Sequence, residues 1–501
     1  MKKITAALIL AAMLIAMASC GSQSDSGNTS VTKAPDADAQ TTAAEETDSR
    51  LAVKEDLPAS DFGGYSFRIL TRDADHHLKE VQATEENGET INDAVFRRNR
   101  AVEEKYNVKL EIIAKSEDDE SLLTNFFKKS VLAGDDAFDL ALPHMVHAGT
   151  TATEGVMYNW LNLKYVDFTK PWWNGSLVDE LTVNDKLFLA SSDFCISAID
   201  YAWSMVANNA MCDNYGVENV YDMVNNGSWT IDKFTEICSL ASSDLNGDGK
   251  FDYQDQYGFT THFNSAINNW MYALDQKVTV MDDSGYPELV INCDKMTTIV
   301  NKVYSLLYED NRTLYVNDAV QSKLGASTHD DAVSGKFAAG ETMFAALRIY
   351  VIDNLRSMDA DFSIIPFPKY DEAQTDYYTH VDGHAPLMAV PNTITDSDRT
   401  GIIIEALSAE SYRQVVPAEL EIVLQSKFAR DAQSYEMLER ILDGRVFTFA
   451  YIYDGWKGMQ WSLTNLMSNK NKDFSSYYAK QEKAALKQIE TVMDAYNNIT
   501  E

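Results

Sequence analysis

The sequence predicts an α/β fold built on parallel strands with covering helices, and three observations support this prediction. Apolar residues alternate with polar ones near residues 65–69 and 108–112, as they do in strands. Apolar residues at helical spacing follow each of these segments. The middle of the chain repeats the same theme, and a length of 501 residues allows two or more domains. Strands that alternate with helices are typical of a parallel sheet.

The first predicted α/β unit runs from Tyr65 to about residue 142. A strand with Tyr65, Phe67 and Ile69 on one face comes first. A helix follows, and its apolar face consists of Ile91, Val95, Val102 and Tyr106. A strand at 108–112 then leads into a helix at about 119–133, which we expect to end at Gly134. A buried strand at 138–142 completes the unit.

Later elements are predicted from the same signals. We expect strands at 186–190, 201–207, 342–349 and 362–365, and another within the segment 244–263, after an acidic loop. Thr230 is expected to cap a helix that continues through Ala241. A long amphipathic helix is expected from about 475 to 498. Its predicted inward side chains are Tyr478, Leu486, Ile489, Met493 and Tyr496.

The amino terminus has the features of an export signal. Two lysines precede an apolar run at 4–17, and small residues at 18 and 19 precede Cys20. The run is shorter than the about 20 residues that span a bilayer. Residues 17–21 resemble the lipobox of bacterial lipoproteins, with Met17 where that motif usually has Leu. We expect a signal peptide at 1–19, a lipid such as palmitate on Cys20, and a position at the extracytoplasmic face of the cell membrane. A membrane-spanning helix and a plain cleaved signal are the alternatives.

Residues 20–60 predict a disordered acidic tether, because they are rich in Ser, Thr, Asp, Ala and Glu and poor in large aliphatic side chains. Cleavage before Cys20 removes two lysines and changes the formal net charge from −34 to −36. Such a charge disfavours nucleic acid and anionic lipid as partners. The other four cysteines have no CxxC spacing, so we expect buried free thiols: Cys195, Cys212, Cys238 and Cys293.

Histidines follow two of the predicted strands. In open α/β sheets, ligands bind at the loops that follow the carboxyl ends of the strands. Here those loops are 71–79 and 143–151, and they carry Arg72, Asp73, Asp75, His76, His77, His144 and His147. We therefore expect these side chains to gather at one sheet edge. Zinc binding by the HxxH at 144 and 147, hydrogen bonding to a ligand, and exposure to solvent are the three interpretations.

The segment 244–255 has the spacing of a calcium-binding loop. Oxygen-bearing side chains occupy loop positions 1, 3, 5, 9 and 12, and position 6 is Gly249. Asp255 takes the last position, where EF-hand loops usually have Glu. The predicted ligands of a structural Ca²⁺ are Asp244, Asn246, Asp248, Lys250 through its carbonyl, Asp252 and Asp255. The alternative is a carboxylate-rich turn without a metal.

Several segments resemble the family 1 extracellular solute-binding proteins of bacterial ABC importers. They include WTIDK at 229–233, QYGF at 256–259, GETINDA at 88–94, RNR at 98–100, EEKYNV at 103–108, AGDD at 133–136, KPWW at 170–173 and IPFPKYD at 365–371. The resemblance covers roughly residues 62–500. It implies a two-lobed, maltose-binding-protein-like clamp of the type II periplasmic class with hinge strands. The implied lobes are 62–190 plus about 385–430, and about 200–380 plus about 432–501.

The resemblance also implies a solute, a partner and a site. The solute would be a mono- or oligosaccharide that is captured by lobe closure, and the partner would be an ABC permease. Sugar sites combine polar groups with aromatic rings. The implied ligand-binding residues are Asp73, His76, His144, His147, Asp193, Trp203, Asn264, Trp270, Arg348, Tyr350, Trp456 and Trp461. Core packing of each tryptophan and a salt bridge at Arg348 are the alternatives. The segment 207–209 reads Ala-Asn-Asn where the family usually has Phe-Asn-Lys.

Rival functions are a lipid-anchored surface enzyme that acts on glycans, a binding protein for peptides or other small solutes, and an adhesion or scaffold protein. A glycan hydrolase needs two carboxyl groups about 5–10 Å apart, and the many acidic residues allow that. The sequence contains no HExxH, GxSxG or P-loop motif. It also lacks repeats of about 20–50 residues. We therefore expect a binding protein that is not an enzyme.

Overall fold

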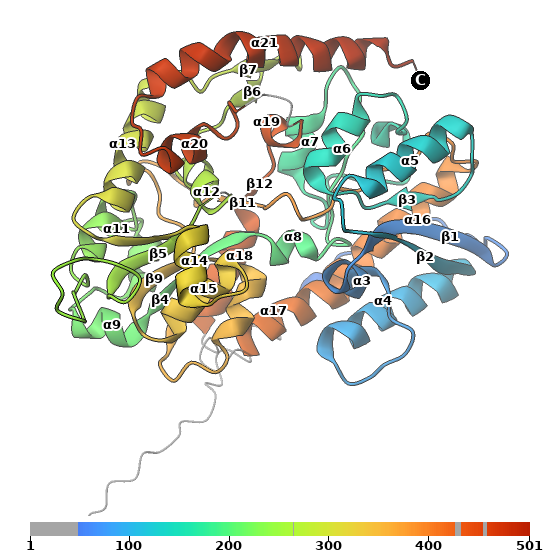
Figure 1. Cartoon of the computed structure of the whole chain (residues 1–501). Coiled ribbons are helices and arrows are strands. Elements are labelled where there is room, and N and C mark those ends of the chain that lie inside the picture. The colour runs from blue at the N-terminus through green and yellow to red at the C-terminus, as the bar shows by residue number, and fades with distance from the viewer. Residues whose placement is uncertain (1–48, 264, 426–431, 454–457, 501) are drawn as a thin grey trace, which may run out of the picture. The chain divides into compact units, whose positions relative to one another are not determined.

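A computed structural model describes residues 49–500, apart from 264, 426–431 and 454–457 (Figure 1). The predicted signal peptide, Cys20 and most of the predicted tether lie outside these residues. Within the described part of the chain, no helix combines the length and the apolar character that crossing a membrane requires.

The first lobe is built on a parallel sheet with the strand order β2-β1-β3. β1 (Tyr65–Asp73) pairs with β2 (Val108–Ser116) along its whole length and with β3 (Leu140–Ala141) at its middle. The helices α4 (Thr90–Tyr106) and α5 (Leu122–Ala133) follow β1 and β2. α5 ends before Gly134, whose φ of 75° gives it the left-handed conformation of a C-cap. The predicted strand–helix alternation is confirmed.

Helices from distant parts of the sequence cover this sheet. The predicted apolar face of α4 is buried, and it packs against α16 (Ser397–Glu410) and α17 (Val416–Gln425). The late segment 386–391 returns beside β3, where Ala141 pairs antiparallel with Ala389. The other elements of this lobe are α3 (Asp75–Val81), α6 (Met145–Ala152), η1 (Trp160–Asn162), α7 (Gly175–Leu181), η3 (Ser411–Val415) and α19 (Phe449–Ile452).

The second lobe has a mixed sheet of five strands in the order β10-β4-β9-β5-β8. β5 is parallel to its neighbours, and β4 is antiparallel to its own. The strands are β4 (Trp203–Asn208), β5 (Tyr257–His262), β8 (Thr313–Val316), β9 (Thr342–Arg348) and β10 (Phe362–Ile365). The hairpin β6 (Thr279–Met281) and β7 (Pro287–Leu289) lies apart from this sheet.

Helices of the second lobe include α11 (Ile231–Cys238), which Thr230 caps as predicted by accepting the Lys233 N–H at 3.3 Å. The other helices are α9 (Asn209–Asn214), α10 (Val220–Asn226), α12 (Ser265–Ala273), α13 (Asp294–Tyr308), α14 (Asp318–Leu324), α15 (His329–Ala338), η2 (Ile349–Leu355), α18 (Ala432–Asp443) and α20 (Ser462–Ser468).

Extended segments join the two lobes. Residues 190–203, which include α8 (Ser197–Asp200), run beside residues 379–389, and the bridges Ala190–Met388 and Ala202–Val381 hold them together. β11 (Thr379–His380) pairs in parallel with β12 (Arg445–Val446). The described residues belong to one compact unit, and the predicted lobe boundaries stay a prediction.

The long helix α21 (Phe474–Asn498) contacts both lobes, as Figure 1 shows at the top of the view. It packs against α13 and α20 of the second lobe. At its other end, the Tyr496 carbonyl accepts a hydrogen bond from Lys186 Nζ at 2.9 Å. The predicted inward position of Leu486 is wrong, because this side chain is 45% exposed while Ala485 is fully buried. The other four predicted inward side chains, Tyr478, Ile489, Met493 and Tyr496, are buried.

Two further predictions need correction. Residues 186–190 form no strand, because they pair only through isolated bridges such as Ala190–Met388, although Leu187–Leu189 are buried. The last part of the predicted tether, from residue 49, packs against the folded lobe. Glu55 lies 2.7 Å from Lys105 and also pairs with Arg413. Composition alone could not show that these charges have partners.

The four cysteines among the described residues are free, as predicted. Cys195, Cys212 and Cys238 are buried, whereas Cys293 is only partly buried.

Candidate functional site

A pocket of about 590 Å³ lies where the carboxyl ends of β1 and β2 face the end of β9. The first lobe contributes Asp73, Ala74, His76, Ser116, Glu117, Asp118 and Glu120 to its lining. The second lobe contributes Arg348 and Tyr350, and the joining segments contribute Tyr201 and His384. Parallel strands place their carboxyl ends at one edge of the sheet. The pocket therefore lies where the sequence analysis expected a ligand.

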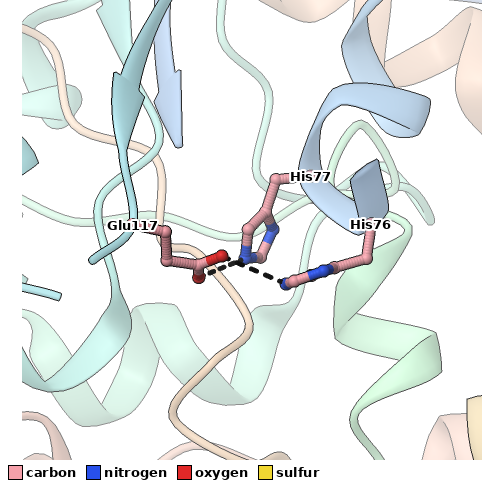
Figure 2. A group of neighbouring side chains, drawn as sticks. All are labelled: His76, His77 and Glu117. Atoms are coloured by element: carbon pink, nitrogen blue, oxygen red, sulfur yellow. Dashed lines mark ion pairs between the residues drawn. The ribbon is translucent and has the colours of Figure 1, made fainter. Parts of the chain in front are cut away.

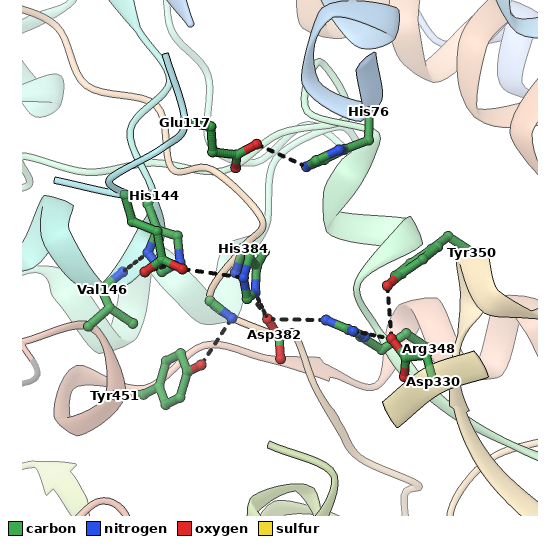
Figure 3. A network of polar contacts seen from close by, with 12 residues as sticks. His76, Glu117, His144, Val146, Asp330, Arg348, Tyr350, Asp382, His384 and Tyr451 are labelled. Atoms are coloured by element: carbon green, nitrogen blue, oxygen red, sulfur yellow. Dashed lines mark hydrogen bonds and ion pairs between the residues drawn. The ribbon is translucent and has the colours of Figure 1, made fainter. Parts of the chain in front are cut away.

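The histidines of the two predicted loops gather at this edge. The rings of His76 and His77 lie 4.1 Å apart, and those of His144 and His147 lie 5.2 Å apart. A histidine that the sequence analysis did not single out joins them, since the His384 ring is 5.2 Å from that of His144 (Figure 3). The predicted gathering of loop histidines is thus observed.

Glu117 holds the first pair of histidines, and Figure 2 shows both rings directed at its carboxylate. His77 Nε2 lies 3.3 Å from Oε1 and His76 Nε2 lies 3.7 Å from Oε2. Arg72 also donates a hydrogen bond to Oε1 at 2.8 Å. Burial and the neighbouring Arg72 cation lower the pKa of His77 to about 2. His77 is therefore neutral at physiological pH.

Glu120 faces the second group of histidines. Its Oε2 lies 3.6 Å from His144 Nε2 and 3.5 Å from His147 Nε2, and its Oε1 lies 3.5 Å from His384 Nε2. Burial, followed by the charge of Arg72, lowers the pKa of His144 to about 2. Burial opposes protonation of His384 as well, but its hydrogen bond to Asp382 and the negative charges of Asp382 and Glu120 together raise its pKa.

Arg348 enters the pocket from the end of β9 in a network of buried charges (Figure 3). It pairs with Asp330, and its Nη1 lies 3.7 Å from Asp382. The Tyr350 hydroxyl donates to Asp330 at 2.9 Å, and His262 Nε2 lies 3.2 Å from the same carboxylate. Burial opposes ionisation of Asp330, but His262 and Arg348 hold its pKa below the usual range. Arg348 therefore lines the pocket and forms salt bridges as well.

Three of the four tryptophans that were predicted to contact a solute lie in the described residues, and none of these three lines the pocket. Trp203 and Trp270 are fully buried, so neither can stack on a solute. Trp270 packs against Phe367 with ring centroids 5.0 Å apart, which makes it part of the second-lobe core. Trp461 is partly buried against Tyr451 and does not line the described pocket. Tyr201 and Tyr350 supply the aromatic rings of the pocket instead.

The remaining predicted residues lie elsewhere. Asp193 lines a separate pocket of about 180 Å³ beside Trp172, Trp173 and Arg445. His144 and His147 lie behind Glu120, outside the residues that line the larger pocket. Asn264 and Trp456 lie outside the described residues. Trp172 and Trp173 are buried, and both indole N–H groups donate to Glu405.

Sequence reasoning missed Glu117, Glu120, Asp330, Asp382 and His384. The two glutamates follow the end of β2, so the rule that selected the loops after β1 and β3 would also have found them. Asp382 and His384 belong to a late joining segment that has no helical or strand pattern around it. Only the return of this segment beside β3 brings them to the site.

The loop 244–255 is closed by its own hydrogen bonds. Asp244 accepts the N–H groups of Gly247 and Gly249 at 2.7 and 2.8 Å. The buried Asp255 accepts those of Leu245 and Asp252 at 3.0 and 2.8 Å. Within the described residues, the groups of His, Cys, Asp or Glu donors that lie within 4.8 Å of one another do not include this loop. The predicted calcium site therefore stays a prediction.

No protein-family model matches the sequence, and no curated protein matches it significantly. Several solved structures are similar to it. A sugar transporter from Rhizobium etli has a TM-score of 0.54 and 13% identity, and the match covers 87% of this chain and 100% of that one. A cyclo/maltodextrin-binding protein complexed with maltotetraose has a TM-score of 0.53 and 13% identity, with 88% and 100% covered.

An ABC substrate-binding protein from Listeria monocytogenes in complex with cycloalternan has a TM-score of 0.50 and 13% identity, with 87% of this chain and 99% of that one covered. At this level of identity the similarity shows the fold. The chain has the two-lobed α/β fold of periplasmic sugar-binding proteins, as predicted.

Proposed function

We propose that this protein is the substrate-binding lipoprotein of an ABC transporter and that it captures an extracellular mono- or oligosaccharide by lobe closure. The pocket that both lobes line carries this proposal. A solute that contacts Asp73 and His76 on one side and Arg348 and Tyr350 on the other gains interactions only when the lobes approach. Such a solute favours the closed state by its differential affinity.

The pocket suits a hydroxyl-rich solute in size and chemistry. Its volume falls within the range of about 300–1,000 Å³ that is usual for small-molecule sites. Glu117, Glu120 and Asp73 are acceptors for hydroxyl protons, and Arg348 is a donor. Tyr350 is 40% exposed, so its ring offers a face for the C–H groups of a sugar ring.

The similar solved structures support a carbohydrate and a role without catalysis. They are described as binding proteins or as a sugar transporter, and two of them hold maltotetraose or cycloalternan. The rival functions, a glycan-degrading surface enzyme and a receptor for peptides or other solutes, predict different outcomes in the same assay.

A ligand screen tests the proposal. Purified protein is mixed with a panel of mono- and oligosaccharides, and melting temperature and intrinsic fluorescence are recorded. At least one sugar should raise the melting temperature, and Tyr350→Ala should weaken its binding about tenfold or more. Tyr286→Ala, which removes an exposed ring from the β6–β7 turn, is the matched control and should leave binding unchanged.

Other results would contradict the proposal. Binding of peptides but not of sugars would assign the other solute class. Consumption of a sugar, followed by chromatography, would favour the enzyme. Small-angle scattering adds a separate check, because the radius of gyration should fall when the sugar closes the lobes.

The membrane anchor belongs to the same proposal and rests on the export signal before Cys20. The mass of the mature amino terminus tests it. A lipidated Cys20 is expected after expression in a bacterial host, whereas an unmodified amino terminus or an intact signal would contradict the anchor. We also propose that the loop 244–255 binds a structural Ca²⁺, on the support of its ligand spacing.

A further inference from the structure

The geometry points to a divalent transition-metal site of the zinc class at the wall of the pocket, with Glu120, His144 and His384 as its ligands. This site does not depend on which solute the pocket binds. A donor set of two imidazoles and one carboxylate suits Zn²⁺.

One donor atom from each of the three residues lies close to the other two, and two of the separations are near those of a tetrahedral site. The carboxylate and ring nitrogens of these three residues all lie within 4.8 Å of one another. Glu120 Oε2 is 3.6 Å from His144 Nε2, and Oε1 is 3.5 Å from His384 Nε2. Ligands about 2.0–2.2 Å from a tetrahedral zinc lie about 3.3–3.6 Å from one another. Only small movements would bring all three onto one ion.

His384 is oriented as metal-binding histidines commonly are. Its Nδ1 lies 2.5 Å from Oδ1 of Asp382, which is buried. A carboxylate that accepts the Nδ1 proton fixes the ring and leaves the Nε2 lone pair for a metal. The Nε2 atom is the one that faces Glu120. Asp382 therefore acts as a positioning residue for this ligand.

His144 changes its hydrogen bonding when it binds the metal. Its Nδ1 accepts the Val146 N–H at 3.3 Å, which places the proton of the neutral ring on Nε2. Coordination through Nε2 moves that proton to Nδ1, so this long hydrogen bond is lost and the metal–nitrogen bond replaces it.

The neighbouring group of His76, His77 and Glu117 has similar donors but is a poorer metal site. Arg72 donates to Glu117 at 2.8 Å and lies 3.5 Å from His77 Nδ1. The Arg72 guanidinium is therefore already paired with the Glu117 carboxylate, which a metal would need as a ligand. Within the described residues, no arginine or lysine hydrogen bond reaches the Glu120 carboxylate. The acids Asp73, Glu117 and Asp118 line the same pocket and favour a cation, against the opposing charge of Arg348.

Three protein ligands leave one tetrahedral position for water or a solute oxygen. Glu120 and His384 both line the pocket, and their side chains are 46% and 43% exposed. These two ligands are therefore accessible from the space that the solute is proposed to enter.

Isothermal titration of the chelator-treated, purified protein with Zn²⁺ tests the site, and Co²⁺ absorption reports the coordination geometry. One equivalent of Zn²⁺ should bind, and Co²⁺ should give the visible bands of a tetrahedral site. His384→Ala, His144→Ala and Glu120→Gln should each weaken binding at least 100-fold. Asp382→Asn should weaken it about 10–100-fold, as loss of an outer partner does.

Matched controls separate this site from its neighbours. His329→Ala and His76→Ala should bind Zn²⁺ within threefold of the unchanged protein. Far-ultraviolet circular dichroism of each metal-free variant should be unchanged, which shows that it is folded. Three results would contradict the proposed metal site. They are Zn²⁺ binding that persists in His384→Ala, Zn²⁺ binding that is lost only in His76→Ala, and the absence of stoichiometric Zn²⁺ binding. The sugar screen is repeated with metal-free protein, so its outcome is independent.

Discussion

Acidic side chains lie close together in two regions of the molecule. One is the loop 244–255, and the other is the sheet edge of the first lobe where His76, His77, His144 and His147 lie, which we call the histidine edge. The two regions differ in how far apart their residues are in the sequence. The loop takes its donors from twelve consecutive positions, and they are held by hydrogen bonds from their own backbone. The histidine edge takes Glu120, His144 and His384 from three distant segments. Its charges are partly buried and are paired across the fold.

This difference shows what each kind of site requires for its stability. A loop with local donors can form wherever its glycines allow the turn, and water solvates its carboxylates. A site with distant donors depends on partners that the fold must bring together, and burial makes an unpaired charge costly. Changes at the edge should therefore have larger effects than matched changes in the loop.

The largest expected effect comes from a matched pair of Asp→Asn substitutions, one in the loop and one at the buried Asp330 of the second lobe, whose partner Arg348 lines the pocket beside the histidine edge. Asp330→Asn should lower the free energy of unfolding by about 3–5 kcal/mol, because it leaves the buried Arg348 and His262 without their carboxylate. Asp248→Asn, in the exposed loop, should change it by about 0.5 kcal/mol or less without calcium. Urea denaturation measures both. Equal effects would contradict the comparison.

Calcium should act on the loop alone. At a concentration about 100-fold above its dissociation constant, calcium should stabilise the protein by about 2.7 kcal/mol. Asp244→Asn combined with Asp248→Asn should abolish this gain, whereas Asp283→Asn in the β6–β7 turn should keep it. Melting curves with calcium or with a chelator provide the measurement. A melting temperature that does not respond to millimolar calcium would refute a structural calcium.

The edge should respond to pH through Glu80. Burial raises the pKa of Glu80 to about 7, although hydrogen bonds from Ser197 oppose the rise. The folded protein thus binds a proton that the unfolded chain releases near pH 4.5. This preference makes the unchanged protein lose stability as pH rises from about 4.5 to 7, by an amount on the order of 3 kcal/mol.

Glu80→Gln should remove this loss. Its amide oxygen can still accept from Ser197, so the variant should gain stability relative to the unchanged protein between pH 5 and pH 8. Unfolding free energies at both pH values measure the gain. A difference between the two proteins that is independent of pH would show that Glu80 does not titrate in this range.

The smallest expected effect is a backbone effect in the loop. Gly249 has a φ of 77°, and no atom lies within 4 Å of the position of an added Cβ. Gly249→Ala should therefore cost only backbone strain, about 1 kcal/mol. Gly335→Ala in α15 has similar space without a positive φ, and it should stabilise the protein by about 0.5–1 kcal/mol. Thermal unfolding distinguishes the expected loss of stability in Gly249→Ala from the expected gain in Gly335→Ala.

Part of the site was predictable, because it follows from local pattern and sheet geometry. Period-two alternation located β1 and β2, and parallel strands necessarily bring the loops with His76 and His144 to one edge. Arg348 and Tyr350 were expected at the pocket from the resemblance, and both line it. The prediction that Trp270 contacts the solute was wrong. An aromatic residue beside a predicted strand can face either the core or a cleft, and the local pattern does not distinguish the two.

The residues that were missed share a physical feature. Asp382 and His384 lie in an irregular segment whose position depends on pairing with β3, far away in the sequence. The local pattern therefore does not mark their place in the site. The error on α21 was of another kind, because Ala485 lies four residues before the buried Ile489 and follows from helical spacing, whereas Leu486 is exposed.

The sequence by itself determined the acidic charge, the α/β alternation, the cap at Thr230 and the turn at Gly249. Each of these depends on residue type and on backbone geometry within a few positions. Only the tertiary structure decided that Glu120 faces His144 and His384, and that Arg348 shares Asp330 with His262. Coulombic and desolvation energies depend on distances through space, and chain folding sets those distances between segments that are remote in sequence.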